Sequence, residues 1–375
     1  MMALSVILTD GVCPNLSDTN FFMSWISDGS LKSFLPKISA RELLMCLLYR
    51  FLRLEELFDC GTLSYMKTES GKDVSQIGIG SYGVGGRGHR DMPITEKAED
   101  QRYIDALAYT LNEGANFTEI ALGYGHGQSL ALFKKALDTS KVSREDIFLT
   151  HSLYPRDLPT LAVVKDDIAG FYEVMETGYA DSTLVTQSLI MQFGEKAVYP
   201  ILHDLIDENK TRYVSLSNAS PSWVMRFKKE FGEKFVAHEG HLSFEVRALQ
   251  DKGVFDACDD AGVENIIWRP LRRNQTMQQN WPLLTELASK YQKTQSQIIL
   301  NWISNLGYRS MVFSATQKHI DENIESVNFK MTDEDYVSIN VFRPQNYHPT
   351  PVDWEGTGID DDIVGLVKDF EEHLG

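Results

Sequence analysis

Short runs of β-branched and aromatic residues alternate with stretches of helical periodicity over most of the chain. From residue 77 onward, eight apolar runs of strand length occur, and each is followed by a stretch in which apolar residues recur every three or four positions. This alternation is typical of a parallel sheet with crossover helices. The expected strands cover residues 77–79, 116–121, 147–153, 182–187, 213–216, 235–238, 265–268 and 310–313.

Eight strand–helix units over about 300 residues match the span of a (β/α)8 barrel. The sequence therefore predicts an α/β protein with TIM-barrel architecture. In that fold, the chemically active side chains lie at the carboxyl ends of the strands. The expected helices cover residues 96–111, 130–138, 161–176, 196–208, 223–231, 246–260, 283–303 with a break near 292–294, and 320–327.

The first 65 residues lack this alternation. Residues 39–42 fit a capping box ahead of an apolar helical face at residues 44–52. Met66 precedes a short polar stretch that is typical of a true N-terminus. We therefore expect residues 1–65 to be an appended segment, which is either a partner-docking helix or the product of a misplaced start codon. Residues 66–375 are then the barrel with an acidic C-terminal tail.

Charge and composition narrow the class of protein. The 375 residues carry 36 Lys and Arg against 53 Asp and Glu, a net charge of −17, which opposes binding to nucleic acid or to an anionic membrane surface. Four scattered cysteines form neither a disulfide framework nor a paired metal motif. With no apolar run of transmembrane length and no signal peptide, we expect a cytoplasmic protein.

Three glycines near the first strand match a dinucleotide-binding pattern. Gly78, Gly80 and Gly83 fit G-x-G-x-x-G, in which the third glycine opens a helix. Here a glycine-rich loop follows instead, and no acidic residue ends a second strand at the expected distance. We therefore interpret this segment as a barrel loop rather than a Rossmann turn.

Six short motifs occur in an order and spacing that resemble the aldo/keto reductase superfamily. The resemblance extends over residues 74–342 and implies a (β/α)8 barrel that uses NAD(P)H to reduce a small-molecule carbonyl, an aldehyde or a ketone, to an alcohol. The barrel follows independently from the strand count. The motifs are Gly78-Ile-Gly80-Ser-Tyr-Gly83, Glu119-Ile-Ala-Leu-Gly-Tyr-Gly125, Arg144-Glu-Asp-Ile-Phe148, Ser215-Leu-Ser-Asn218, Trp268-Arg-Pro-Leu271 and Glu322-Asn323.

The resemblance implies a tyrosine that donates a proton to the carbonyl oxygen while a hydride reaches the carbonyl carbon. Tyr124 takes this position, five residues after Glu119, where the family has an aspartate. The family's lysine, after Phe-x-Thr on the third strand, corresponds to His151. Its histidine after the fourth strand corresponds to Thr186, or to Gln187 if the alignment slips by one. Three of the four catalytic positions therefore differ.

The histidine in the lysine position suggests a pH-dependent substitute. Histidine carries a charge only when protonated, and its unperturbed pKa is about 6.5. A neighbouring carboxylate favours the protonated form. We therefore expect Glu119 and His151 to form a pair at the strand ends. The alternative is that His151 only packs at the end of its strand.

The resemblance also implies residues that hold the nicotinamide. Ser217 and Asn218, after the fifth strand, correspond to the pair that hydrogen-bonds the carboxamide, and both side chains carry donors and acceptors. Trp268 corresponds to the aromatic side chain that stacks on the ring. Glu239 stands where a glutamine normally contacts the carboxamide, and it donates a hydrogen bond only when protonated.

The last motifs imply the adenine end of the dinucleotide. His319 replaces the usual arginine or glutamine, and with Lys318 it offers positive charge for a 2′-phosphate. We therefore expect NADP(H), with NAD(H) as an alternative. The remaining positions in these motifs are Leu271, Ser314, Glu322 and Asn323.

Two other interpretations stay open. In the first, the barrel binds a cofactor or a partner without turnover. In the second, Glu239 and His241 bind a metal with His151 or His126 as a third ligand, for lyase or isomerase chemistry. On a strand, alternation places Glu239 and His241 on one face and His238 on the other.

Overall fold

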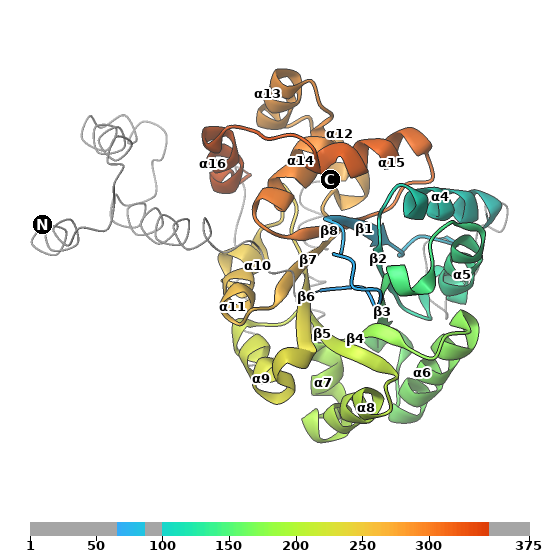
Figure 1. Cartoon of the computed structure of the whole chain (residues 1–375). Coiled ribbons are helices and arrows are strands. Elements are labelled where there is room, and N and C mark those ends of the chain that lie inside the picture. Colours follow the sequence, from blue (N-terminus) through green and yellow to red (C-terminus); the bar gives the residue numbers. More distant parts are fainter. Residues whose placement is uncertain (1–65, 87–99, 345–375) are drawn as a thin grey trace, which may run out of the picture. The chain divides into compact units, whose positions relative to one another are not determined.

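Eight parallel strands form a closed barrel, which Figure 1 shows end on. This computed structural model describes residues 66–86 and 100–344. The expected appended segment, residues 1–65, and most of the expected tail lie outside the described residues. Each strand pairs with its neighbours in chain order, and β1 closes the barrel on β8. The strands are β1 Ile77–Gly80, β2 Phe117–Ile120, β3 Phe148–Leu153, β4 Ala180–Thr186, β5 Thr211–Ser217, β6 Phe235–His241, β7 Glu264–Trp268 and β8 Arg309–Val312.

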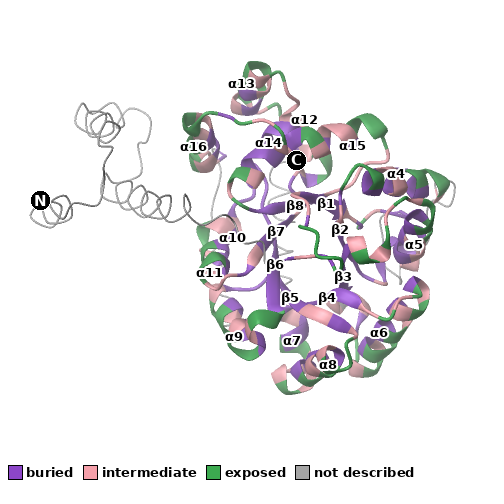
Figure 2. Cartoon of the chain, in the orientation of Figure 1, coloured by how far each residue is buried: buried purple, intermediate pink, exposed green. Residues whose placement is uncertain are grey.

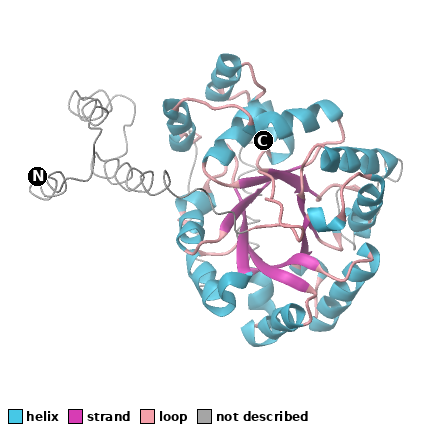
Figure 3. Ribbon diagram, viewed as in Figure 1, coloured by secondary structure: helices cyan, strands magenta, loops and turns pink. Residues whose placement is uncertain are grey.

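Helices surround this ring of strands, as Figure 3 shows. The eight expected strands are all present, and the predicted (β/α)8 barrel is confirmed. The helices are α4 Asp100–Asn112, α5 Ser129–Thr139, α6 Leu161–Met175, α7 Gln187–Phe193, α8 Glu195–Asp207, α9 Pro221–Phe231, α10 Ala248–Asp251, α11 Val254–Asp260, α12 Gln275–Gln278, α13 Pro282–Tyr291, α14 Gln295–Asn305, α15 Gln317–Ile324 and α16 Asp333–Val341.

Local sequence signals explain where several helices begin and end. Thr160 and Ser220 each accept a hydrogen bond from a backbone N–H in the first turn of α6 and α9. Thr294 and Gln297 form a capping box at the start of α14. Gln292, at a φ of 53°, ends α13. The expected break near residues 292–294 is therefore confirmed.

Two helix predictions need correction. The stretch 246–260 is two helices rather than one, because Gly253 adopts a left-handed φ of 72° between α10 and α11. The short helix α7 was not expected. It begins directly after β4, where the Thr186 hydroxyl accepts a hydrogen bond from the Leu189 N–H.

Strand alternation separates the barrel interior from the face that packs on the helices. Phe117, Phe148 and Met311 lie in one buried cluster inside the barrel, and Phe148 stacks on Tyr213 with ring centroids 6.2 Å apart. Figure 2 shows the strands as buried and the outer helix faces as exposed. A residue two positions further along a strand faces the same side. The interior positions can therefore be counted from these aromatic side chains.

The chain enters the barrel through a buried methionine. Met66 is fully buried in the interior cluster, and its backbone N–H donates to Glu264 Oε1 at 3.0 Å. The other oxygen of that carboxylate pairs with Arg309 at 2.5 Å. The Arg309 guanidinium also donates to the carbonyl oxygens of Val74 and Ser75. This end of the barrel is therefore closed by an ion pair and the segment before β1.

The G-x-G-x-x-G segment is a barrel strand and loop, as expected. A turn rather than a helix follows β1. A Cβ atom on Gly78 would lie 2.3 Å from the Phe117 ring, so this glycine makes room for an aromatic side chain inside the barrel. Its function is packing, not the approach of a pyrophosphate.

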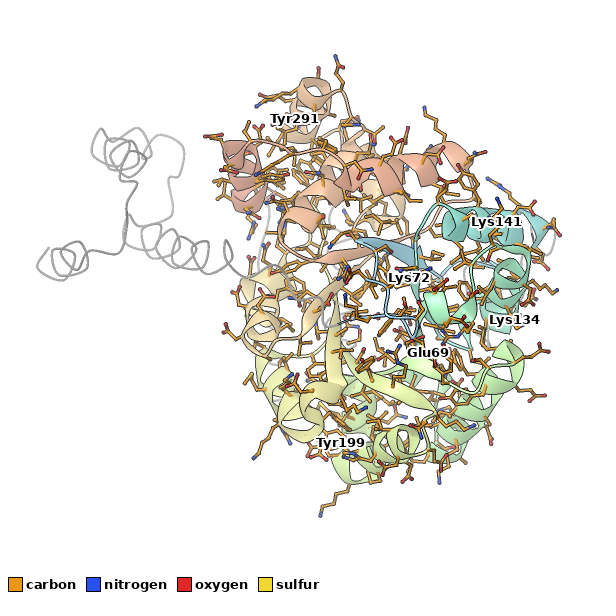
Figure 4. The ribbon with its side chains drawn as sticks, in the orientation of Figure 1. Glu69, Lys72, Lys134, Lys141, Tyr199 and Tyr291 are labelled. Carbon is orange, nitrogen blue, oxygen red and sulfur yellow. The ribbon has the colours of Figure 1, made fainter. Side chains whose placement is uncertain are left out.

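The outer helices are braced by polar contacts at the periphery. Tyr291 on α13, labelled in Figure 4, donates from its hydroxyl to Asp335 on α16. Lys290 pairs with the same carboxylate at 2.7 Å. In the described part of the chain, no helix combines the length and the apolar character needed to cross a bilayer.

We expect Gly78→Ala to lower the free energy of unfolding by about 1–3 kcal/mol, because the added methyl group overlaps the buried Phe117 ring. Gly80→Ala is the matched control, since a Cβ atom there meets Met311 at an ordinary 3.5 Å. Urea unfolding followed by circular dichroism measures both. Equal stability of the two variants would contradict this account of Gly78.

Candidate active site

Tyr124 and Glu119 meet at the carboxyl end of β2. Tyr124 begins a short 3-10 turn, Tyr124–Gly127, and its hydroxyl donates to Glu119 Oε1 at 3.4 Å. Both side chains are 8% exposed. The turn packs tightly against the loop after β1, because a Cβ atom on Gly125 would lie 2.1 Å from the Val84 carbonyl oxygen. Glycine at this position therefore allows Tyr124 to reach the interior.

The structure does not bring His151 to Glu119. The His151 side chain lies outside the barrel, where its Nε2 is 2.9 Å from Asp167 on α6 and its ring stacks on Phe171 at 4.1 Å. Register gives the reason, because His151 pairs with Ile120 and thus shares the helix-facing side with it. The expected pair of Glu119 and His151 is therefore wrong.

Ser152 occupies the interior position on β3 instead. It lies two residues beyond Thr150, the register partner of Glu119, and its side chain hydrogen-bonds the Glu119 carboxyl. The motif match did not indicate Ser152. Counting alternate positions from Phe148 would have found it, because Phe148, Thr150 and Ser152 share one face. This interior position beside Glu119 thus carries a hydroxyl and no charge.

Thr186 is the last residue of β4 and the N-cap of α7. Its hydroxyl accepts from the Leu189 N–H at 3.0 Å and lies 2.9 Å from the Ser188 hydroxyl. Gln187, the alternative position, accepts a hydrogen bond from the Ser220 N–H through its side-chain oxygen. Both side chains are therefore engaged in holding loops at the strand ends.

The three residues expected at the carboxamide lie together between β5 and β6. Ser217 is the register partner of Glu239 and donates from its hydroxyl to the Glu239 carbonyl oxygen at 3.0 Å. Asn218 donates from its backbone N–H to the same carbonyl oxygen and holds a left-handed φ of 50°. These contacts fix the two side chains at the interior edge of the barrel.

Trp268 joins this group from the end of β7. Its indole N–H donates to Asn218 Oδ1 at 3.2 Å, and one face of its ring stacks on His241 at 4.6 Å. The ring is only partly buried. Glu239 and His241 lie on the interior face of β6, and His238 lies on its outer face, as predicted from strand alternation. There His238 accepts a hydrogen bond from the Ala219 N–H.

The loop after β7 is held by a buried ion pair. Arg272 is 3.5 Å from Glu245, and both side chains are fully buried. Thr276 and Trp281 also donate to the Glu245 carboxylate. Leu271 lies in this loop and is half-buried. The loop is therefore fixed against the barrel although several of its residues have positive φ angles.

The residues expected at the adenine end lie on α15 and the loop before it. The Ser314 hydroxyl accepts from the Thr316 N–H at 3.1 Å. His319 is exposed, Asn323 is buried, and Glu322 lies 3.7 Å from Lys318. Lys318 and His319 are thus consecutive, exposed residues near the start of α15.

Burial controls the ionisation of the interior acids. Burial raises the pKa of Glu119 to about 7, although hydrogen bonds from Ser152 and Tyr124 lower it. Burial and the charge of Glu119 raise the pKa of Glu239 well above its ordinary value. Burial and then Glu119 raise the pKa of Tyr124 well above 10. At neutral pH, Glu119 is therefore divided between its two forms, and the surroundings of Glu239 favour its protonated form.

A metal site finds no support in this geometry. Among residues 66–86 and 100–344, no three His, Cys, Asp or Glu side chains are grouped in a way that could hold a metal ion. His151 is on the far side of β3 from Glu239, so the two cannot share an ion. Burial and the charges of Arg269 and Arg272 lower the pKa of His241.

The barrel thus carries a tyrosine and a carboxyl group at the end of β2, and hydroxyl, amide and indole groups at the ends of β5 and β7. The family model described as the aldo/keto reductase family matches residues 76–343. The chain therefore belongs to the aldo/keto reductase family, whose members act on small carbonyl compounds.

Individual relatives are distant. Glyoxal reductase from Bacillus subtilis (strain 168) is 24% identical over 252 residues, which cover 64% of this chain and 87% of that protein. Aldose reductase C from Dictyostelium discoideum is 22% identical over 315 residues, which cover 78% and 93%.

Solved structures share the fold. A thermostable aldo-keto reductase in complex with the inhibitor epalrestat has a TM-score of 0.65 at 20% identity and covers 73% of this chain and 97% of its own. The aldo/keto reductase from Klebsiella pneumoniae in complex with NADP and acetate has a TM-score of 0.61 at 16% identity and covers 75% and 96%.

The raised pKa of Glu119 predicts a pH-dependent stability. Between the unfolded value of 4.5 and the folded value of about 7, the folded protein binds more protons, so its stability falls as pH rises through this window. We expect Glu119→Gln to reduce this fall, measured by unfolding at pH 5 and pH 8. Glu233→Gln, at an exposed site, is the control. An unchanged pH dependence in Glu119→Gln would contradict the burial of an ionising carboxyl.

Proposed function

We propose that this protein is an NAD(P)H-dependent oxidoreductase that interconverts a carbonyl and an alcohol, with Tyr124 as the group that donates the proton to the carbonyl oxygen. The observation that carries this proposal is the buried hydrogen bond of 3.4 Å between Tyr124 and Glu119 at the strand ends. A hydroxyl and a carboxyl in contact, away from water, form a path for one proton.

The side chains beside this pair suit a nicotinamide dinucleotide, which supplies the hydride when bound. Trp268 offers a partly exposed aromatic face, and Asn218 keeps its amide N–H groups as donors, because its oxygen already accepts from the indole. Burial and the charge of Glu119 favour the protonated form of Glu239, which both donates and accepts, as the expected glutamine would. Lys318 and His319 offer positive charge to a 2′-phosphate, which favours NADPH.

Glu119 is suited to reprotonate Tyr124 after Tyr124 has donated its proton to the carbonyl oxygen. Its pKa of about 7 lies near neutral pH, where an acid exchanges protons readily. Once ionised, Glu119 raises the Tyr124 pKa further, because it places a negative charge 3.4 Å from the hydroxyl. Carbonyl reduction therefore depends on the neutral form of Glu119.

A second function has one observation in its favour. Ser152, facing Glu119 from β3, has no charge with which to lower the Tyr124 pKa, whereas the family's lysine has one. A barrel that binds a dinucleotide without turnover, as a cofactor-binding or interaction module, is consistent with this change. Consumption of the bound cofactor in the presence of a carbonyl separates the two functions.

We expect NADPH and NADH each to quench tryptophan fluorescence saturably, with Trp268→Ala losing cofactor affinity because the stacking face is removed. Glyoxal is the first carbonyl to test, since one relative is named glyoxal reductase. We expect Tyr124→Phe to reduce glyoxal-dependent NADPH oxidation by about 100-fold or more while cofactor affinity is kept.

Binding without NADPH consumption by any carbonyl would support the module instead. A folded protein that binds neither dinucleotide would contradict both functions. A twofold or smaller change in affinity in Trp268→Ala would show that the indole does not stack on the ring.

Ser152→Lys is expected to increase carbonyl reduction by about tenfold, because an interior cation lowers the Tyr124 pKa. We expect reduction by the wild type to fall above pH 7 as Glu119 ionises, and the lysine variant to show a weaker fall. The matched control is His151→Lys, which places the same charge outside the barrel beside Asp167. Greater activity in the control than in Ser152→Lys would contradict the interior assignment.

A further inference from the structure

Two buried glutamates face the interior of the barrel near the carboxyl ends of its strands. Glu119 on β2 and Glu239 on β6 are both buried and close enough for the charge of one to act on the other. Both also act on Tyr124. The interior position on β3 holds the uncharged Ser152, and the position where the resemblance expects a glutamine holds the ionisable Glu239.

The described residues that neighbour Glu239 on β5, β6 and β7 bring no positive charge to it. From β5 it faces Ser217, and from β7 its register partner is the apolar Ile266. His241, next along β6 on the same face, has a pKa lowered by burial and is therefore neutral. Across the barrel, Glu119 acts on Glu239, and both carboxyl groups act on Tyr124. Arg269 and Arg272, in the loop after β7, act on His241. A positive charge brought into this space by a ligand would thus meet carboxyl groups on two sides.

The two redox states of a nicotinamide differ in this respect. The oxidised ring carries one positive charge and the reduced ring carries none, so nearby carboxylates stabilise the oxidised ring selectively. We propose that Glu119 and Glu239 together bias this site toward the oxidised dinucleotide, and so toward the oxidation of alcohols. This inference depends on the proposed function, because it needs a nicotinamide at the Ser217, Asn218 and Trp268 positions.

The oxidation is balanced by the substrate, the chain's own residues and the dinucleotide that the site would hold. A bound oxidised nicotinamide would supply the acceptor for the hydride that leaves as the C–H bond of the alcohol breaks. The O–H proton passes to Tyr124 as the Tyr124 proton passes along the 3.4 Å hydrogen bond to the ionised Glu119 carboxylate. The alcohol becomes a carbonyl, and Glu119 ends protonated. The same carboxyl groups thus favour the oxidised cofactor and accept the proton released by the substrate.

Because protonation of the two carboxyl groups is linked to cofactor binding, measurements of binding affinity alone can test the bias. A positive ring next to protonated carboxyl groups favours their ionisation, so binding of the oxidised form releases protons. Binding of the reduced form brings no such charge. Affinity for the oxidised form should therefore rise with pH, relative to the affinity for the reduced form.

The experiment is calorimetric titration of the full chain with NADP⁺ and with NADPH at pH 6, 7 and 8, in two buffers of different ionisation enthalpy. For the wild type, we expect the ratio of the two dissociation constants to shift toward NADP⁺ by about tenfold between pH 6 and pH 8, with proton release only for NADP⁺. Glu239→Gln should reduce the preference for NADP⁺ at pH 8 by about fivefold or more.

Lys318→Ala is the control. Loss of a side chain at the adenine end should weaken the binding of NADP⁺ and of NADPH equally, and so leave the ratio of their dissociation constants unchanged. Circular dichroism establishes that each variant is folded. Ser152→Lys gives an independent test, since an added cation should shift the ratio of dissociation constants toward NADPH. A ratio that is independent of pH and unchanged in Glu239→Gln would overturn the inference while leaving the proposed function intact. Failure of a folded wild type to bind either form would overturn both.

Discussion

The site depends on the two-residue period of strands in a closed barrel. Each side chain on such a strand faces either the interior or the helices, and a shift of one position exchanges the two. On β3 this exchange separates His151, which pairs with Asp167 outside, from Ser152, which contacts Glu119 inside. The chemistry available to Tyr124 is thus decided by orientation and not by which residue types occur nearby in sequence.

Desolvation then determines how the interior groups behave. An acid in water ionises near pH 4, but the same acid enclosed by the barrel keeps its proton to a higher pH because its charged form is poorly solvated. The hydrogen bonds of Glu119 offset part of this cost, and the carboxyl remains poised near neutrality. For Glu239, the charge of Glu119 adds to the effect of burial, and the two together raise its pKa well above the ordinary value. Two carboxyl groups of different acidity thus lie buried inside the same barrel.

The sequence predicted the fold well because periodicity is a property of whole segments. Eight strands and the break near Gln292 follow from apolar spacing and from local backbone signals. The division at Gly253 was missed because one left-handed glycine interrupts an otherwise helical pattern. The positions of Ser217, Asn218 and Trp268 relative to one another were anticipated through the family motifs. The side of β3 on which His151 lies was not anticipated. A motif match fixes a residue's position along the chain but leaves the register open to an error of one residue, which is enough to reverse the side that a side chain faces.

The buried amide of Met66 has a consequence for shortening the chain. Its N–H and the carbonyl oxygens of Val74 and Ser75 all bond to the ion pair of Glu264 and Arg309. A truncated barrel must therefore begin at or before Met66, because starting at Ile77 would open the interior to water at the end opposite the site. Domain boundaries chosen from the first strand alone would cut away the base of the barrel.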